Sequence, residues 1–118
     1  MNYLMIGAIS GCLVVIMGAF GAHALNEILD DYGKSIYNKA VLYHLFHSLA
    51  LLILGLINKI HPEIPLSISG WSFLFGIILF SGSLYILAIT GIKSLGMITP
   101  VGGILFVIGW GFLILKAY

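Results

Sequence analysis

Four long apolar stretches joined by short polar connections constrain this chain more than any other feature. They cover about residues 2–22, 36–58, 68–90 and 100–116 of a 118-residue sequence. A membrane-spanning helix needs about 20 predominantly apolar residues, so each stretch has a length suited to one crossing of a bilayer. The remaining residues are too few for a separate soluble domain. The sequence therefore predicts one all-α transmembrane domain over residues 1–118, with four helices in an up-down bundle.

The composition is that of a chain solvated by lipid. Hydrophobic residues make up 61% of it and charged residues only 8%, and the mean hydropathy is +1.16. A soluble domain carries about 25% charged residues, so a cytosolic enzyme, a disordered tail and a secreted module are excluded. The net charge of +1 gives no electrostatic reason to expect a nucleic-acid partner. The predicted partner is the lipid bilayer itself.

The connection after the first stretch has an amphipathic pattern. Its apolar side chains recur at helical spacing, at Leu25, Ile28, Leu29 and Tyr32. Charged residues fill the gaps, which is typical of a helix lying in the membrane interface. We therefore predict a short interfacial helix over about residues 25–33, with these four side chains toward the bilayer. Gly33 is expected to end it, and Ser35 is expected to cap the next helix.

The pair Thr99-Pro100 marks the expected start of the fourth helix. Proline is favoured at the first helical position, because its missing N–H has no helical partner there in any case. The alternative is a helix that starts at Leu95 and is kinked at Pro100.

Lysines and aromatic side chains bear on the orientation in the membrane. The bundle end that holds the 22–40 and 91–99 connections carries Lys34, Lys39 and Lys93, whereas the other end carries Lys59 and Lys116. The positive-inside rule then assigns the first end to the cytoplasm, by three lysines to two. Aromatic belts are expected from Tyr32, Tyr37 and Tyr43 at the first end and from Tyr3, Trp71, Trp110 and Tyr118 at the second.

Small residues are spaced for close packing of helices. Gly7, Gly11, Gly18 and Ala22 share one face of the first helix, and Gly102 and Gly109 form a seam on the fourth. Helices in a bilayer associate through close contact of small residues. One interpretation is packing within the four-helix bundle, and the other is that one seam is a homo-oligomer interface. Both can hold, because there are two seams.

Polar side chains within the spans gather toward the end that holds residues 22–40. Such groups are costly in lipid and are therefore candidates for a ligand site. The candidates are His23, His44, His47, Tyr43, Ser48, Ser81, Ser83 and Tyr85. The opposite half of the bundle is almost purely aliphatic. This argues against a channel, because ions need polar contacts through the whole depth.

Three histidines give the sharpest hypothesis about a site. His44 and His47 are three residues apart and so are neighbours on one helix face, and His23 ends the first helix. Three imidazoles can hold zinc or copper, and a pair can ligate haem or hydrogen-bond a quinone, so the cofactor stays open. If Gly21 turns the chain back, His23 is expected to join the other two in one cluster. The alternative is that each histidine is satisfied by a local partner, such as a backbone carbonyl or Ser48.

Four ordered motifs give the chain a family resemblance. They are residues 18–25 (GAFGAHAL), 43–50 (YHLFHSLA), 80–85 (FSGSLY), and 98–103 (ITPVGG) followed by Gly109-Trp110. With them the chain resembles the domain-of-unknown-function 423 family over essentially its whole length. The resemblance implies a small four-span protein of the bacterial inner membrane with no settled activity. The family pattern includes His23, His44 and His47.

The sequence carries no catalytic signature. Its serines lack the context of a nucleophile elbow, and Gly102-Gly103 follow a proline on a helix, so they do not form a phosphate loop. We therefore interpret the chain as a non-enzymatic membrane module that packs with itself or with a larger membrane complex. The alternative is a histidine-based binding protein for a metal, haem, quinone or lipid near the 22–40 connection.

Overall fold

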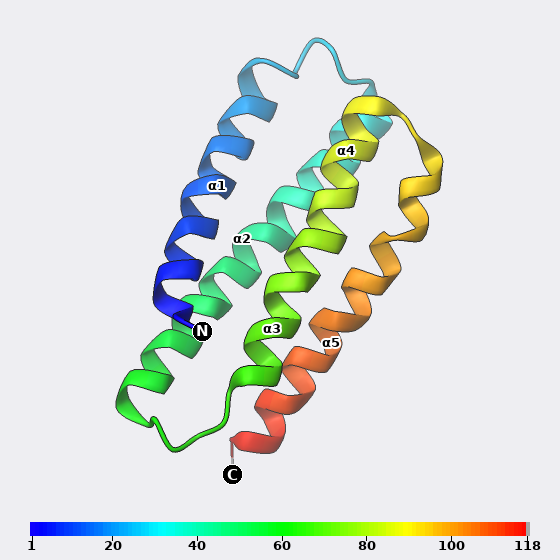
Figure 1. Ribbon diagram of the computed structural model, residues 1–118. Coiled ribbons are helices and arrows are strands. Elements are labelled where there is room, and N and C mark those ends of the chain that lie inside the picture. The colour runs from blue at the N-terminus through cyan, green and yellow to red at the C-terminus, as the bar shows by residue number, and fades with distance from the viewer. Residues whose placement is uncertain (118) are drawn as a thin grey trace.

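The structure is a computed structural model that describes residues 1–117, and these residues form helices and turns alone. The elements are α1 (Tyr3–His23), α2 (Asp31–Ile60), α3 (Ser67–Gly76), the π-helical segment η1 (Ile77–Ser81), α4 (Gly82–Thr90), the 3₁₀ segment η2 (Lys93–Met97) and α5 (Thr99–Lys116). Because α3, η1 and α4 follow one another without a break, they act as one rod. The described residues thus hold four helical spans long and apolar enough to cross a membrane, which confirms the predicted all-α fold (Figure 1). Tyr118, expected in an aromatic belt, lies outside the described residues.

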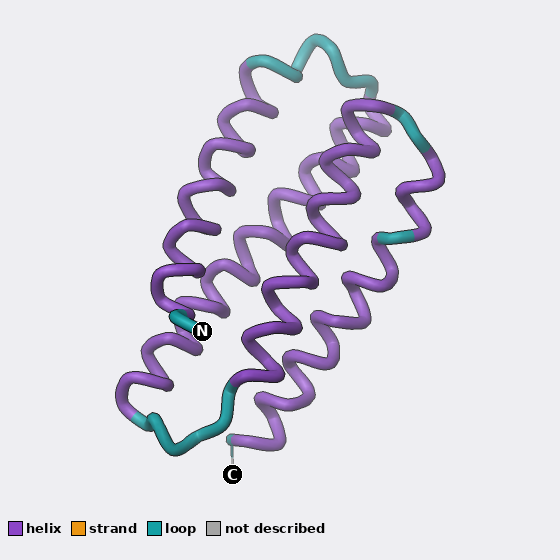
Figure 2. The backbone as a smooth tube through the Cα atoms, viewed as in Figure 1, coloured by secondary structure: helices purple, strands orange, loops and turns teal. Residues whose placement is uncertain are grey.

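The four rods run alternately up and down. Both chain ends and the 61–66 loop lie at one end of the bundle, and the connections 24–30 and 91–98 lie at the other (Figures 1 and 2). α1 packs on α2, α2 packs on α4 and η1, and α5 packs on α3 and η1. Half of the apolar window of the α3–η1–α4 rod is buried (50%) and nearly as much of α2 (44%), against 17% in each of the other two spans. α1 and α5 are therefore the outer helices of the bundle, which measures 49 × 26 × 18 Å.

α2 starts earlier than the predicted residue 36. The carboxylate of Asp30 accepts a hydrogen bond from the backbone N–H of Gly33 at 2.7 Å, and this cap starts the helix at Asp31. Gly33 and Ser35 therefore lie inside the first turns of α2, where they neither end one helix nor cap the next.

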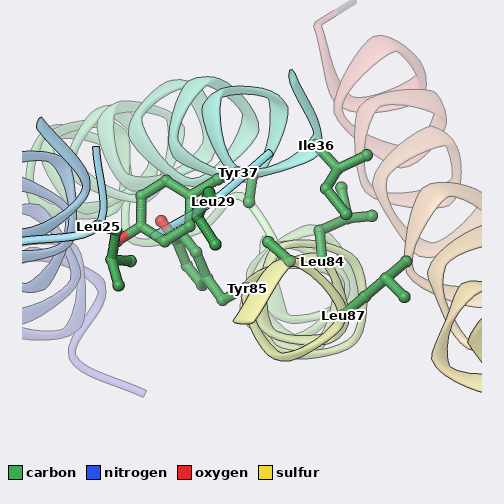
Figure 3. Close-up of a cluster of buried hydrophobic side chains, with 9 residues drawn as sticks. Leu25, Leu29, Ile36, Tyr37, Leu84, Tyr85 and Leu87 are labelled. Atoms are coloured by element: carbon green, nitrogen blue, oxygen red, sulfur yellow. The ribbon is translucent and has the colours of Figure 1, made fainter. Parts of the chain in front are cut away.

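Residues 24–30 form successive turns in place of the predicted interfacial helix over 25–33. Leu25 and Leu29 are buried in a core cluster with side chains of α2 and α4 (Figure 3). Only Ile28 and Tyr32 stay exposed, at 74% and 63%. The predicted amphipathic helix is wrong in this detail, because two of its four apolar side chains are taken up by the bundle instead of facing the bilayer.

The last connection follows local sequence signals. α4 ends at Thr90 and is capped by Gly91, whose φ of +72° lies in the left-handed region that glycine adopts without steric cost. α5 begins at Thr99 with Pro100 in its first turn. Leu95 belongs to the separate segment η2, so the alternative of one helix kinked at Pro100 does not occur.

Three of the seam glycines are used for packing inside the chain. A Cβ on Gly7 would lie 2.9 Å from the backbone nitrogen of Leu52 in α2. A Cβ on Gly102 would meet the backbone of Phe80 in η1, and a Cβ on Gly109 would lie 2.6 Å from the Phe73 ring of α3. Close approach of backbones at small residues is how helices pack in lipid, so these positions hold α1 and α5 to the two central rods.

The π-helical segment η1 is where the third rod meets both of its neighbours. Such segments hold an extra residue in one turn and recur at functional sites. The Ser81 hydroxyl at its end donates to the backbone carbonyl of Ala40 in α2 at 2.8 Å. On the other side, the backbone of Phe80 touches Gly102 of α5. η1 therefore contacts both α2 and α5, and these contacts set the positions of the two helices relative to each other along the bundle axis.

Candidate functional site

His44 is the centre of a hydrogen-bonded chain that joins three helices. Its Nδ1 lies 2.9 Å from the Tyr85 hydroxyl in α4, and its Nε2 lies 3.1 Å from the Ser10 hydroxyl in α1. Ser10 Oγ lies 2.6 Å from Ser48 Oγ, which lies 2.7 Å from the carbonyl oxygen of His44. All four side chains are buried. We call Ser10, His44, Ser48 and Tyr85 the polar chain.

The donor and the acceptor of each hydrogen bond in the polar chain can be assigned by starting from the carbonyl oxygen of His44. A carbonyl oxygen only accepts, so Ser48 donates to it and accepts from Ser10. The Ser10 proton is thereby used, so Ser10 accepts from the Nε2–H of His44. A neutral imidazole with its proton on Nε2 satisfies the whole chain, because Nδ1 then accepts from the Tyr85 hydroxyl. Neither ring nitrogen of His44 is left for a ligand.

His47 has aromatic surroundings instead. Its ring stacks on Phe106 of α5, with the centroids 3.5 Å apart and the planes 7° from parallel. Its Nδ1–H donates to the carbonyl oxygen of Tyr43 at 2.9 Å. Its Nε2 accepts from the indole N–H of Trp110 at 3.1 Å, and since indole only donates, this ring is neutral as well. His47 thus attaches α5 to α2, and we call His47, Phe106 and Trp110 the aromatic stack.

The predicted cluster of three histidines is not present. His44 and His47 are neighbours on α2, but the first bonds to α1 and α4 and the second contacts α5. His23 is exposed at the end of α1, about 20 Å along the helix axis from Ser10, the partner of His44. Over residues 1–117, no three His, Cys, Asp or Glu side chains are placed to hold a metal ion. Helical spacing correctly predicts that His44 and His47 share a face of α2. The side chains on the neighbouring helices determine which partners each ring contacts.

The other candidate residues differ in whether they have internal partners. Ser81 donates to Ala40, and the Ser83 hydroxyl lies 2.6 Å from the Thr99 hydroxyl of α5. The Tyr43 hydroxyl differs, because it has no hydrogen-bond partner in the described part of the chain. Tyr43 is also partly exposed, at 39%.

Three aromatic side chains predicted for the membrane interfaces lie inside the bundle, and the first is Tyr3, which is buried in a core cluster with side chains of α2 and α3. Tyr37 is buried, and its hydroxyl donates to the carbonyl oxygen of Met17 in α1. Trp110 is half-buried against His47. Indole and phenol each carry one polar group. In Tyr37 and Trp110 this group is hydrogen-bonded within the protein instead of at the membrane interface.

A crevice of about 560 Å³ opens between α2 and α5. Tyr43 and His47 line it from α2, Phe106 and Trp110 line it from α5, and Phe80 of η1 also borders it. Tyr43 and Phe80 are in ring contact, with centroids 4.5 Å apart. The crevice is thus an aromatic-walled gap between two spans, next to the aromatic stack.

Three residues of these two sites were missed by the sequence reasoning. Ser10 is a lone hydroxyl on the buried face of α1, and its cost in lipid was a usable signal that it has a partner. Phe106 and Trp110 are four residues apart and so share a face of α5. No feature of the sequence indicates which helix this face of α5 packs against.

A bundle of four apolar helices, with its buried polar groups bonded internally, defines a small multi-span membrane protein. The chain belongs to the family described as "Protein of unknown function (DUF423)", whose model matches residues 17–103. It is 47% identical over 116 residues to the UPF0382 membrane protein SAB0533 of Staphylococcus aureus, covering 98% of this chain and 94% of that protein. It is 40% identical over 116 residues to the UPF0382 membrane protein YwdK of Bacillus subtilis, with the same coverage. No solved structure matches the chain.

Proposed function

We propose that this protein is a non-enzymatic membrane module that acts by associating with itself or with a larger membrane complex. The observation that carries the proposal is the internal use of its polar groups. Within residues 1–117, every buried side-chain nitrogen or oxygen has a hydrogen-bond partner in the protein. A catalytic or ligating group must be free to bind its substrate, whereas groups that are all paired stabilise a fixed bundle. Binding of a metal or haem through His44 or His47 would break one of these bonds.

The outer face of α1 supports the second half of the proposal. α1 packs on α2 and leaves exposed, at alternating spacings of four and three, the side chains of Ala8, Cys12, Val15, Ala19 and Ala22, with the partly exposed Gly11 beside them. A Cβ on Gly11 would meet nothing within 4 Å, unlike one on Gly7. Three-four spacing of small residues is the pattern by which a second helix packs closely in lipid.

Replacing Gly11 with leucine tests this association without disturbing the fold. The open space at Gly11 lets the bundle fold normally, while the added side chain blocks close approach of a second α1. We expect wild-type protein in nanodiscs or native mass spectra to include dimers or larger species, and Gly11→Leu to be monomeric. Gly111→Leu is the matched control, since Gly111 on α5 also faces open space.

Two results would contradict the proposal. One is a wild-type protein that stays monomeric and captures no membrane partner at native expression. The other is an assembly unchanged by Gly11→Leu, which would remove α1 as the interface. Gly7→Leu is unsuitable for this test, because it would separate α1 from α2 within the same chain.

We also propose a location in the bacterial cell membrane with the connections 24–30 and 91–98 on the cytoplasmic side. The lysine count of three to two supports this orientation. In a Cys12→Ser background, Ser67→Cys should react with a membrane-impermeant maleimide added to whole cells, and Ser94→Cys should not. Both serines are exposed and lie at opposite ends of the bundle. The reverse pattern of labelling would invert the orientation.

A further inference from the structure

The crevice between α2 and α5 is walled mostly by aromatic side chains. Its volume of about 560 Å³ falls within the range of sites that bind small molecules. It is bordered by Tyr43, His47, Phe80, Phe106 and Trp110, with Gly103 on the α5 side. A Cβ added to Gly103 would lie 3.7 Å from the Phe80 ring, which is an ordinary van der Waals distance. Space therefore remains in front of Gly103.

The depth of the crevice decides what can enter it. Lys39 and Lys59 bracket the apolar part of α2 and lie about 30 Å apart along the helix, which is the thickness of the hydrocarbon core. His47 is within one turn of the midpoint between them, and Tyr43 is one turn closer to the 24–30 end. A lipid headgroup remains at the surface, so at this depth only a hydrocarbon chain is present.

The polar groups of the crevice narrow its occupant further. Both nitrogens of His47 and the indole N–H of Trp110 are already bonded to each other or to backbone. The Tyr43 hydroxyl is the group without a partner in the described residues, and an unpaired hydroxyl in hydrocarbon is costly. Side chains on a helix lean toward its N-terminus, which places this hydroxyl toward the surface at the 24–30 end. Ester carbonyls of diacyl lipids lie on that side.

The size of the crevice disfavours a protein helix. The lining on α5 runs from Gly103 to Trp110, about 10 Å along the helix axis. A helix that crosses the hydrocarbon core is about 30 Å long, so it would contact the crevice over only about a third of its length. A single hydrocarbon chain is much narrower and fits.

We propose that the crevice binds one acyl chain of a diacyl phospholipid, with the Tyr43 hydroxyl donating to the ester carbonyl of that chain. The chain lies over Phe80 and Phe106 and passes in front of Gly103 toward Trp110. The site is on the other side of α2 from the free face of α1, so this proposal and the proposed association fail or hold independently.

Trp110 provides a direct reporter of the chain. Trp71 and Trp110 are the two tryptophans of the protein, and Trp71 is exposed on α3 outside the crevice. We would reconstitute Trp71→Phe, which retains Trp110, into phosphatidylcholine vesicles with increasing fractions of a lipid brominated in its acyl chains. Trp110→Phe, which retains Trp71, is the control for lipid that merely surrounds the protein.

The expected result is quenching of Trp110 that saturates at a low fraction of brominated lipid, while quenching of Trp71 follows the bulk fraction. Gly103→Leu places a branched side chain in the proposed path of the acyl chain and should abolish the saturable part, whereas Gly111→Leu on the same helix should not. Tyr43→Phe keeps the ring and removes the hydroxyl, so half-saturation should need about fivefold more lipid, the equivalent of one hydrogen bond. Helical circular dichroism and elution volume show whether each variant is folded, and Gly103→Ala replaces Gly103→Leu if the latter does not fold.

Three outcomes would overturn the proposal. Quenching of Trp110 that follows the bulk fraction, or is unchanged in Gly103→Leu, means ordinary surrounding lipid. Quenching that increases as the protein is diluted in lipid means that a second copy of the chain covers the crevice. Displacement of the brominated lipid by small amounts of an isoprenoid quinone would assign the crevice to that class of molecule instead.

Discussion

The polar chain and the aromatic stack are built on two histidines of one helix and have opposite chemistry. His44 and His47 are both almost fully buried, at 5% and 3% exposure, and lie three residues apart on α2. His44 is bonded to hydroxyls of α1 and α4, whereas His47 stacks on a ring and accepts from an indole of α5. The difference shows that helical spacing determines burial, and that the residues of the facing helix determine what a buried histidine does.

The two regions also divide the mechanical task of holding the bundle. The polar chain secures α1 and α4 to one side of α2, and the aromatic stack secures α5 to the other side. Polar bonds inside a membrane need every member present, because a remaining partner is left unpaired in lipid. A stack depends mainly on shape and contact area. The two regions should therefore respond differently to the same substitution.

Replacing His44 with phenylalanine should have the largest effect. The ring volume is retained, but the Tyr85 hydroxyl loses its acceptor and the Ser10 hydroxyl loses its donor in a buried site. We expect the free energy of unfolding to fall by about 2–3 kcal/mol. Denaturant titration in mixed micelles would measure it, with Phe46→Leu at a largely exposed position of the same helix as the control. A loss no larger than that of the control would mean that the polar chain contributes nothing to stability.

Replacing Ser10 with alanine tests whether the polar chain acts as a unit. The variant removes the acceptor of His44 Nε2–H and the donor to Ser48 together. We expect a loss of about 1–2 kcal/mol in the wild type and clearly less in the His44→Phe background. A double-mutant cycle measures this coupling. Strict additivity of the two substitutions would show that Ser10 and His44 are independent, in contrast to the bonded geometry.

The sequence predicts the fold of this protein much better than its site. Runs of about 20 apolar residues determine four spans by solvation alone, and the pair Thr99-Pro100 gives the start of α5. The glycine seam at Gly102 and Gly109 also predicts close packing, since only small residues allow it. These features depend on local composition and need no knowledge of which helix lies opposite.

The site depends on relations that the sequence does not contain. The divergence of His44 and His47 arises from Ser10 and Tyr85 on one side and Phe106 on the other, all distant along the chain. The π-helical segment η1 shifts the facing of the third rod by part of a turn, and no proline marks it. The interfacial helix predicted over residues 25–33 is wrong for the same reason. The spacing of Leu25 and Leu29 fits a helix on the membrane surface, but both side chains are buried in the core by contacts with distant helices.

Replacing His47 with phenylalanine should have a smaller effect than the same change at His44. A phenyl ring retains the contact with Phe106, and only the bond from Trp110 and the bond to the Tyr43 carbonyl are lost. We expect a loss of about 1 kcal/mol in the free energy of unfolding. Trp110 emission in the Trp71→Phe background should shift, because the indole N–H loses its acceptor. A loss equal to that of His44→Phe would remove the distinction between the two regions.

His61 in the 61–66 loop is the reference for a histidine hydrogen bond that is exposed to water. Removing this bond should have the smallest effect on stability. His61 is 56% exposed, and its Nδ1 lies 3.1 Å from a carboxylate oxygen of Glu63. The pKa of Glu63 lies below its ordinary value of 4.5, first because its own backbone N–H bonds to the carboxylate and second because His61 does. A lowered pKa in the folded state gives stability that is present above the ordinary pKa and is lost as the pH falls through the lowered one. Because the pair is exposed and screened, the melting curves of the wild type and Glu63→Gln should differ only slightly from pH 7 to pH 5, and this small difference should disappear as the pH falls below the ordinary value of 4.5 and Glu63 becomes protonated. A clear difference between them at pH 7 would mean that an exposed histidine bond contributes like the buried ones, and that burial is not what separates His44 and His47 from His61.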